Sequence, residues 1–167
     1  MPPPFPWTYP YQEDGPRLGA VVLRPIVPII AIGTETAPPA LALVDSGCEH
    51  VLAAPWLAAS VGVDPDDGHR SLELGIGGET LLVRFVDLTL RLHAPGGGHD
   101  DHVEWRTEVG FVSHWRPTWP LLAGQVGFLD RFTVTMSRHA QRLAIEDWSD
   151  FDRRFGVPPG GLTDVST

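Results

Sequence analysis

Glycine and proline interrupt this chain so often that few long helices are expected. The 167 residues include 18 glycines and 17 prolines, and both residues favour turns over helix interiors. Between the turns lie short runs rich in β-branched and apolar residues, which favour strands. With 43% hydrophobic and 20% charged residues, the composition is that of a globular protein, and the length suits one domain with its own core. The sequence therefore predicts an all-β fold with one or two short helices.

Charge and cysteine content narrow the classes of partner. The net charge of −9 argues against nucleic acid, since phosphate binding needs clustered Lys and Arg. The single cysteine allows no internal disulfide and favours a reducing compartment. The first residues lack the pattern of a secretory signal, and no run of about 18 apolar residues suggests a membrane span. We therefore expect a soluble cytoplasmic protein with no nucleic-acid or membrane partner.

Composition divides the chain into three parts. Residues 1–17 are Pro-rich and aromatic and are expected to form an extended arm, residues 18–147 a domain, and residues 148–167 a tail that begins as a short helix. Pro28 indicates that its strand lies at the edge of a sheet or contains a bulge. Helical spacing predicts a short helix within residues 51–62, with Pro55 in its first turn or at a break, and a second helical segment after Gly124.

Residues 71–94, "SLELGIGGETLLVRFVDLTLRLHA", form two alternating apolar runs joined at "GIGGE". This pattern predicts a β-hairpin whose tip glycines supply a positive φ. In the second run, Phe85, Leu88, Leu90 and Leu92 are expected near one face after a small offset.

The stretch "LALVDSGCEH" (residues 41–50) carries the sharpest chemical signal. Its apolar run has no alternation, which predicts a strand buried on both faces. A carboxylate at the end of such a strand, Asp45, is held in a fixed position, as catalysis requires. Ser46 adds a hydroxyl, and Gly47 lets the backbone turn close to the acid.

Three motifs occur in a fixed order: "LVDSG", then "GIGGE", then "LLAG". Together, over residues 18–147, they resemble the single-domain retropepsin-like aspartic proteases, whose fold is a closed β-barrel with a flap hairpin. Residues 93–120 look like an insertion relative to a minimal member. The resemblance implies the following roles: Asp45 catalytic; Ser46 and Gly47 supporting the active-site loop, with Ser46 crossing to a partner subunit; Gly75, Ile76, Gly77 and Gly78 in the substrate-binding flap; Leu122 and Gly124 structural in a second, psi-shaped loop.

The mechanism of that family needs two carboxylates that share one proton. This chain has a single Asp-Ser-Gly, so an active site requires a homodimer in which Asp45 of each subunit meets at a two-fold axis. The predicted function is hydrolysis of a peptide or protein substrate, without metal or other cofactor.

Other interpretations remain open. A retropepsin-like domain that dimerises or binds peptides without cutting them is the main alternative. A metal-dependent hydrolase is another, with donors from a polar loop: His93, His99, Asp100, Asp101 and His102.

The remaining motifs are weaker. Cys48 with His50 suggests a thiol nucleophile, although Cys is more often a small buried hydrophobe. "GIGGE" lacks the final glycine and the Gly-Lys-Ser of phosphate-binding loops, and Ser46 lacks the Gly-x-Ser-x-Gly elbow. Trp105, Trp115 and Trp119 are expected to serve core packing or a dimer surface.

Overall fold

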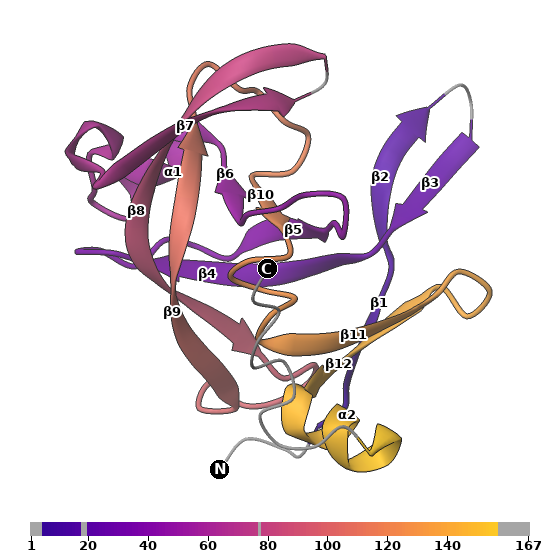
Figure 1. Cartoon of the computed structure of the whole chain (residues 1–167). Helices are drawn as coiled ribbons and strands as arrows, with labels where there is room; N and C mark the ends of the chain where they lie inside the picture. Colours follow the sequence, from indigo (N-terminus) through magenta and orange to yellow (C-terminus); the bar gives the residue numbers. More distant parts are fainter. Residues whose placement is uncertain (1–4, 18–19, 77, 157–167) are drawn as a thin grey trace, which may run out of the picture.

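The computed structural model of the chain describes residues 5–17, 20–76 and 78–156. Strands make up most of the secondary structure, and the helices are short (Figure 1). In chain order the elements are β1 (Trp7–Pro10), β2 (Gln12–Arg17), β3 (Ala20–Arg24), β4 (Ile26–Ile32), β5 (Ala40–Val44), β6 (Leu52–Ala53), α1 (Pro55–Ser60), the 3-10 helix η1 (Pro65–Asp67), β7 (Arg70–Ile76), β8 (Glu79–His93), β9 (His102–Val112), β10 (Leu121–Ala123), β11 (Phe132–Ser137), β12 (Arg142–Asp147) and α2 (Trp148–Phe155).

In the part of the chain that the structure describes, six strands close into a barrel (Figure 1). They follow one another in the order β4, β5, β10, β6, β9 and β8, and β4 pairs with β8 to complete the circle. The predicted all-β barrel is therefore confirmed. Residues 26–29 of β4 pair with β5, whereas residues 29–32 pair with β8. Pro28 thus lies where β4 has a strand on one side only, which a residue without an N–H tolerates.

Segment 93–120, expected to be an insertion relative to a minimal member of the family, contains β9, which belongs to the barrel. β9 pairs with β8 along its whole length and also with β6. The loop between β8 and β9 and the segment between β9 and β10 are the parts outside the strands.

Two apolar clusters lie on opposite faces of β8. Leu88, Leu90 and Leu92 point into the main core inside the barrel. The expectation that Phe85 shares their face is wrong, because side chains alternate along a strand and odd-numbered positions face the other way. Phe85 packs instead with Leu52 and two valines in a second cluster, next to the β7–β8 hairpin.

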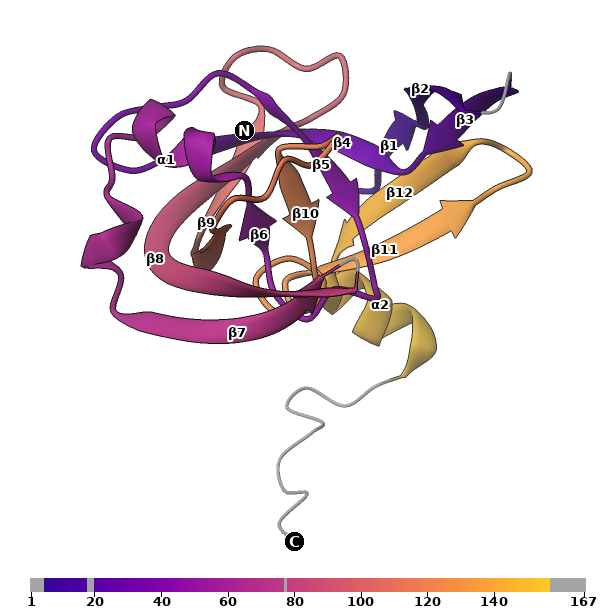
Figure 2. The same ribbon diagram turned by 90° about the horizontal axis from the view of Figure 1, so that it is seen from above.

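The N-terminal strand packs against the barrel domain. β1 pairs with β12 in a sheet that also contains β11, and Trp7 and Tyr9 are buried. The Tyr9 hydroxyl donates a hydrogen bond to the carbonyl oxygen of His93 (2.6 Å). Residues 7–10 of the predicted arm are thus extended, with alternate side chains buried, whereas β2 and β3 form a hairpin that projects from the barrel (Figure 2).

Both short helices have clear sequence causes. Pro55 begins α1, at the position where a missing N–H is harmless. α2 confirms the helix expected at the start of the tail: the Asp147 side chain accepts a hydrogen bond from the N–H of Ser149, and Gly156 ends the helix in the left-handed region. The tail from residue 157 lies outside the described residues. No helix in the described ranges is long and apolar enough to cross a bilayer.

Two local predictions are wrong. The segment after Gly124 forms turns rather than a helix, because Gly127 has a φ of +99° and its carbonyl accepts a hydrogen bond from Trp105 Nε1. The strand before Asp45 is not buried on both faces. Leu41 is 46% exposed, whereas Ala42 is fully buried, so β5 alternates like a strand with one covered face.

Candidate functional site

Asp45 lies directly after β5, and its backbone is fixed on both sides. Its N–H donates to the carbonyl oxygen of Ala123 (3.1 Å), and its carbonyl accepts from the N–H of Cys48 (3.2 Å). The carboxylate is half-buried, and its Oδ1 accepts a hydrogen bond from the N–H of Gly47 (2.9 Å). The carboxylate of Asp45 is thus held by the turn that follows it, and its catalytic role stays a prediction.

Residues 45–51 connect β5 to β6, and we call them the Asp45 loop. β10 lies between these two strands. It runs parallel to β5, with Ala123 opposite Val44, and antiparallel to β6, with Leu122 opposite Leu52. The loop connecting β5 to β6 must therefore pass around the end of β10. The two motifs "LVDSG" and "LLAG" are thereby brought side by side.

Gly124 is where that loop and β10 touch. A Cβ at Gly124 would stand 2.2 Å from the carbonyl oxygen of His50 and 2.7 Å from that of Cys48. Both oxygens are held by hydrogen bonds: the carbonyl oxygen of Cys48 accepts from the N–H of Gln125 (2.8 Å), and that of His50 accepts from the thiol of Cys48 (3.1 Å). Only glycine fits this approach, which supports the structural role predicted for Gly124.

Gln125 holds the same loop and was not identified from the sequence. Its Nε2 donates to the carbonyl oxygen of Ser46 (2.8 Å), and the next residue, Val126, donates its N–H to the carbonyl of Glu49 (2.7 Å). The one feature of the sequence that could have identified Gln125 is its position directly after Gly124, a predicted site residue. Ser46 itself is exposed, and its predicted contact with a partner subunit stays a prediction.

The predicted hairpin is present as β7 and β8 (Figure 1). Ile76 pairs with Glu79, and Gly75 pairs with Thr80, so the two strands are joined tightly between Ile76 and Glu79. Gly78 has a φ of +88°, as predicted for the tip. Gly77 lies outside the described residues.

One cleft of about 360 Å³ brings the first two motifs together. It contains Asp45 and Gly47 from the strand-end loop and Gly75 and Ile76 from the hairpin, with Leu122 from β10. Ser46, Gly78 and Gly124 do not line it. Cys48, which the sequence offered only as a possible thiol nucleophile, also lines it, together with three residues that sequence reasoning did not single out: Glu49, Leu52 and Leu74. We call this space the Asp45 cleft.

The Asp45 cleft combines one acidic edge with an apolar wall. Leu74 and Ile76 are alternate residues of β7 and therefore share a face, together with Leu52 and Leu122. Glu49 contributes a second carboxylate, and its side chain is 75% exposed. The arrangement can hold an extended chain with apolar side chains against the wall and a polar group at Asp45.

The Cys48 thiol is poorly suited to act as a nucleophile. Burial raises its pKa, and the nearby Asp45 and Glu49 charges act in the same direction. Its Sγ is 3.1 Å from the carbonyl oxygen of His50, to which it donates. The imidazole of His50 packs edge-on against Phe85, with ring centroids 5.0 Å apart. A reactive cysteine needs the opposite, a lowered pKa.

The histidines of the β8–β9 loop lie near one another without forming a donor set. The ring of His93 is 5.3 Å from that of His102 and 6.1 Å from that of His99, between centroids. Within the described residues, no group of three or more His, Cys, Asp or Glu side chains is arranged to hold a metal ion.

A larger cleft, of about 640 Å³, lies between α1, η1 and the segment after β9. Trp56, Arg84, Trp115 and Arg116 line it, and Arg84 is paired with Asp66 (3.1 Å). It contains none of the residues of the three motifs. The Asp45 cleft is therefore the candidate site, although it is the smaller of the two.

Comparisons with known proteins add no relative. No protein-family model matches the sequence, and neither curated proteins nor solved structures give a significant match.

Proposed function

We propose that this chain is a retropepsin-like aspartic endopeptidase that acts as a homodimer. The observation that carries the proposal is the position of Asp45, at a strand end and in a cleft that it shares with a glycine-tipped hairpin. A carboxylate held by a backbone hydrogen bond beside an apolar wall supplies one half of the catalytic pair that the proposal needs, next to a surface for an extended peptide.

The scaffold around Asp45 supports the same proposal. A short strand inserted between β5 and β6 fits the psi-shaped loop that the resemblance implies. Gly124 makes the backbone contact with the Asp45 loop, and the second motif supplies the hairpin. All three motifs thus serve one site, although the strands that carry them are far apart in sequence.

The proposed chemistry uses one Asp45 from each subunit. The two carboxylates share a single proton, because two acids about 3 Å apart do not both ionise readily. The ionised member takes a proton from water as the water oxygen attacks the peptide carbonyl carbon, and the protonated member gives its proton to the carbonyl oxygen. The dyad then gives its proton to the peptide nitrogen as the C–N bond breaks, and a hydroxyl of the tetrahedral intermediate returns a proton to the other carboxylate as the new carboxyl group forms, so the dyad again holds one proton.

The walls of the cleft suggest the substrate class. Leu52, Leu74 and Leu122 offer apolar contacts beside Asp45, so the favoured substrates are extended peptides with apolar residues next to the scissile bond. The hairpin, acting as the flap, would cover the bound peptide and exclude bulk water.

Replacement of Asp45 tests the proposal. Asp45→Asn keeps an oxygen that can accept the hydrogen bond from Gly47, so the fold should be retained. With a mixed peptide library at acidic to neutral pH, cleavage by the wild type should fall by about 10²- to 10⁴-fold in the variant, the range expected for loss of a general acid–base group. Full activity in a folded Asp45→Asn protein would refute the proposal.

A second candidate is a retropepsin-like domain that binds peptides without cutting them. It is favoured by one observation: the chain supplies a single Asp-Ser-Gly carboxylate, whereas the apolar wall is already present in one copy. Peptide binding at the cleft with no products over a broad pH range would support this candidate over the protease.

A further inference from the structure

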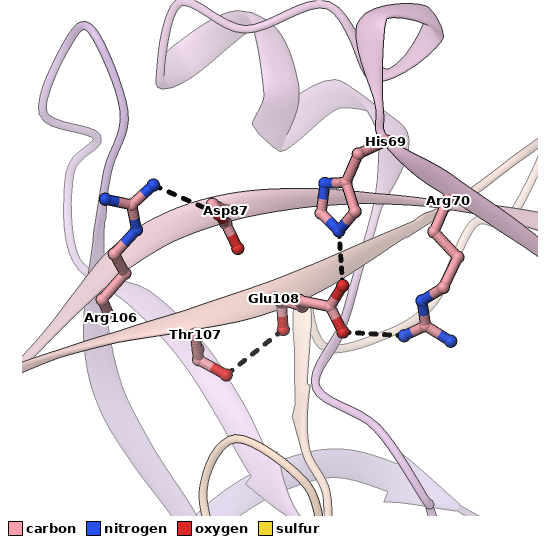
Figure 3. A network of polar contacts seen from close by, with 6 residues as sticks. All are labelled: His69, Arg70, Asp87, Arg106, Thr107 and Glu108. Atoms are coloured by element: carbon pink, nitrogen blue, oxygen red, sulfur yellow. Dashed lines mark hydrogen bonds and ion pairs between the residues drawn. The ribbon is translucent and has the colours of Figure 1, made fainter.

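Glu108 of β9 joins two side chains at the beginning of β7 (Figure 3). Its Oε1 is 2.5 Å from Nε2 of His69, and its Oε2 accepts a hydrogen bond from Nη2 of Arg70 (2.8 Å). Glu108 is therefore held through both oxygens by residues 39 and 38 positions away. We call this group of three residues the Glu108 clamp.

Arg70 connects the clamp to the wall of the candidate site. Its guanidinium lies over the ring of Phe85, 3.9 Å from the centroid, in cation–π geometry. Phe85 is fully buried and packs in the cluster that contains Leu52 and Leu74 of the Asp45 cleft. The imidazole of His50, which ends the Asp45 loop, contacts the same ring.

The β7 arm of the hairpin has few other attachments at this point, whereas the β8 arm pairs with β9 from Val83 onward. In the described part of the chain, β7 is the edge of its sheet and pairs with β8 alone. The clamp passes over β8 and ties the beginning of β7 to β9. The hairpin can therefore bend where β8 leaves β9, near Val83, and the clamp holds the β7 arm beside that point.

A small rotation at the base of the β7–β8 hairpin displaces the tip of the hairpin. Leu72 pairs with Val83, the β8 residue nearest the tip that pairs with β9, and Ile76 lies about 13 Å farther along β7 at roughly 3.3 Å per residue. A rotation of about 5° at that point would therefore move the tip by about 1 Å.

We infer that Glu108 is a positioning residue of the hairpin: it holds the base of β7 in the orientation that keeps the hairpin over the Asp45 cleft. This inference rests on the proposed function only in naming the hairpin a flap. The geometric part concerns the mobility of the hairpin and is measurable whether or not the protein cuts peptides.

Hydrogen–deuterium exchange of the full chain, comparing wild type with Glu108→Gln, tests the geometric part. The glutamine keeps the shape of the side chain and removes its charge. Exchange of the β7 amides between Leu72 and Ile76 should rise about fivefold, the factor that corresponds to about 1 kcal/mol for a partly exposed ion pair. Exchange in β4 and β5 should stay unchanged.

Asp87→Asn is the matched control. Asp87 is the β8 residue directly opposite Glu108, and it pairs with Arg106 of β9 (3.1 Å) without contacting β7 (Figure 3). This variant should leave amide exchange of β7 at the wild-type level.

A second variant keeps the test available if Glu108→Gln fails to fold. Arg70→Gln removes one partner of Glu108 and should raise exchange of the β7 amides in the same way.

A rise in amide exchange that is equal in all strands, equal in both variants, or absent from β7 would overturn the inference.

A kinetic measurement separates the inference about Glu108 from the proposed function. If wild type cleaves peptides, Glu108→Gln should raise KM by up to about fivefold, since a less populated closed hairpin weakens apparent binding by that fraction, and should change kcat less. A protein without peptidase activity that still shows the local exchange effect would refute the protease and retain the clamp.

Discussion

Gly124 and His50 lie so close that a Cβ on the glycine would stand 2.2 Å from the carbonyl oxygen of His50. This contact joins β10 to the loop that carries Asp45. Gly124→Ala should therefore push the loop away from β10. We expect a loss of about 2 kcal/mol in the free energy of unfolding, typical of overpacking, and a Tm lower by about 4–8 °C for a chain of this size.

Gly75→Ala is the control for that variant. A Cβ at Gly75 would have no heavy atom within 4 Å, and Gly75 has no positive φ, so its Tm should match the wild type. Equal Tm values for Gly124→Ala and wild type would contradict the packing argument.

The Cys48 thiol should react slowly. Burial raises its pKa, so the thiolate fraction near neutral pH is below that of an exposed cysteine. Alkylation of the folded protein by iodoacetamide, followed by intact mass, should be slower than alkylation of a short Cys peptide at the same pH, and should accelerate as the pH rises. Reaction at or above the peptide rate would reopen the thiol interpretation.

Acid should loosen the base of the hairpin before the rest of the fold. The hydrogen bond from His69 is the main cause that lowers the pKa of Glu108, with further contributions from Arg70. A carboxyl group with a lowered folded pKa stabilises above its unfolded pKa, and that contribution disappears as the pH falls through the folded value. The neighbouring charges, Asp87 and Arg106, pair with each other.

This prediction is checked by measuring hydrogen–deuterium exchange of the β7 amides at a series of decreasing pH values, with each rate corrected for the intrinsic exchange rate at that pH. Opening of β7 should increase below the lowered pKa of Glu108, and Glu108→Gln should show no such increase. A hairpin whose opening is independent of pH, or is greatest near neutral pH, would contradict the assignment.

Local patterns predicted the parts of the fold that local chemistry determines. The apolar run before Asp45, Gly78 at the hairpin tip and the position of Pro55 each specify a backbone state, and each agrees with the structure. The Asp45 loop and the hairpin were predicted as neighbours through a resemblance, and the cleft that they share is consistent with it.

Features that depend on distant pairing were not predictable. β10 has three residues, too few for a pattern to reveal that they lie between β5 and β6. Glu108 meets His69 and Arg70 only through the registers of β7, β8 and β9. The turns after Gly124 depend on a hydrogen bond from Trp105, which overrides the helical spacing of that segment.

The most direct test of the central claim is a calorimetric titration with a peptide mimic whose central hydroxyl takes the place of the attacking water. A site built from two Asp45 carboxylates predicts one inhibitor bound per two chains, with affinity lost in Asp45→Asn. Binding of one inhibitor per chain, or unchanged affinity in Asp45→Asn, would contradict it.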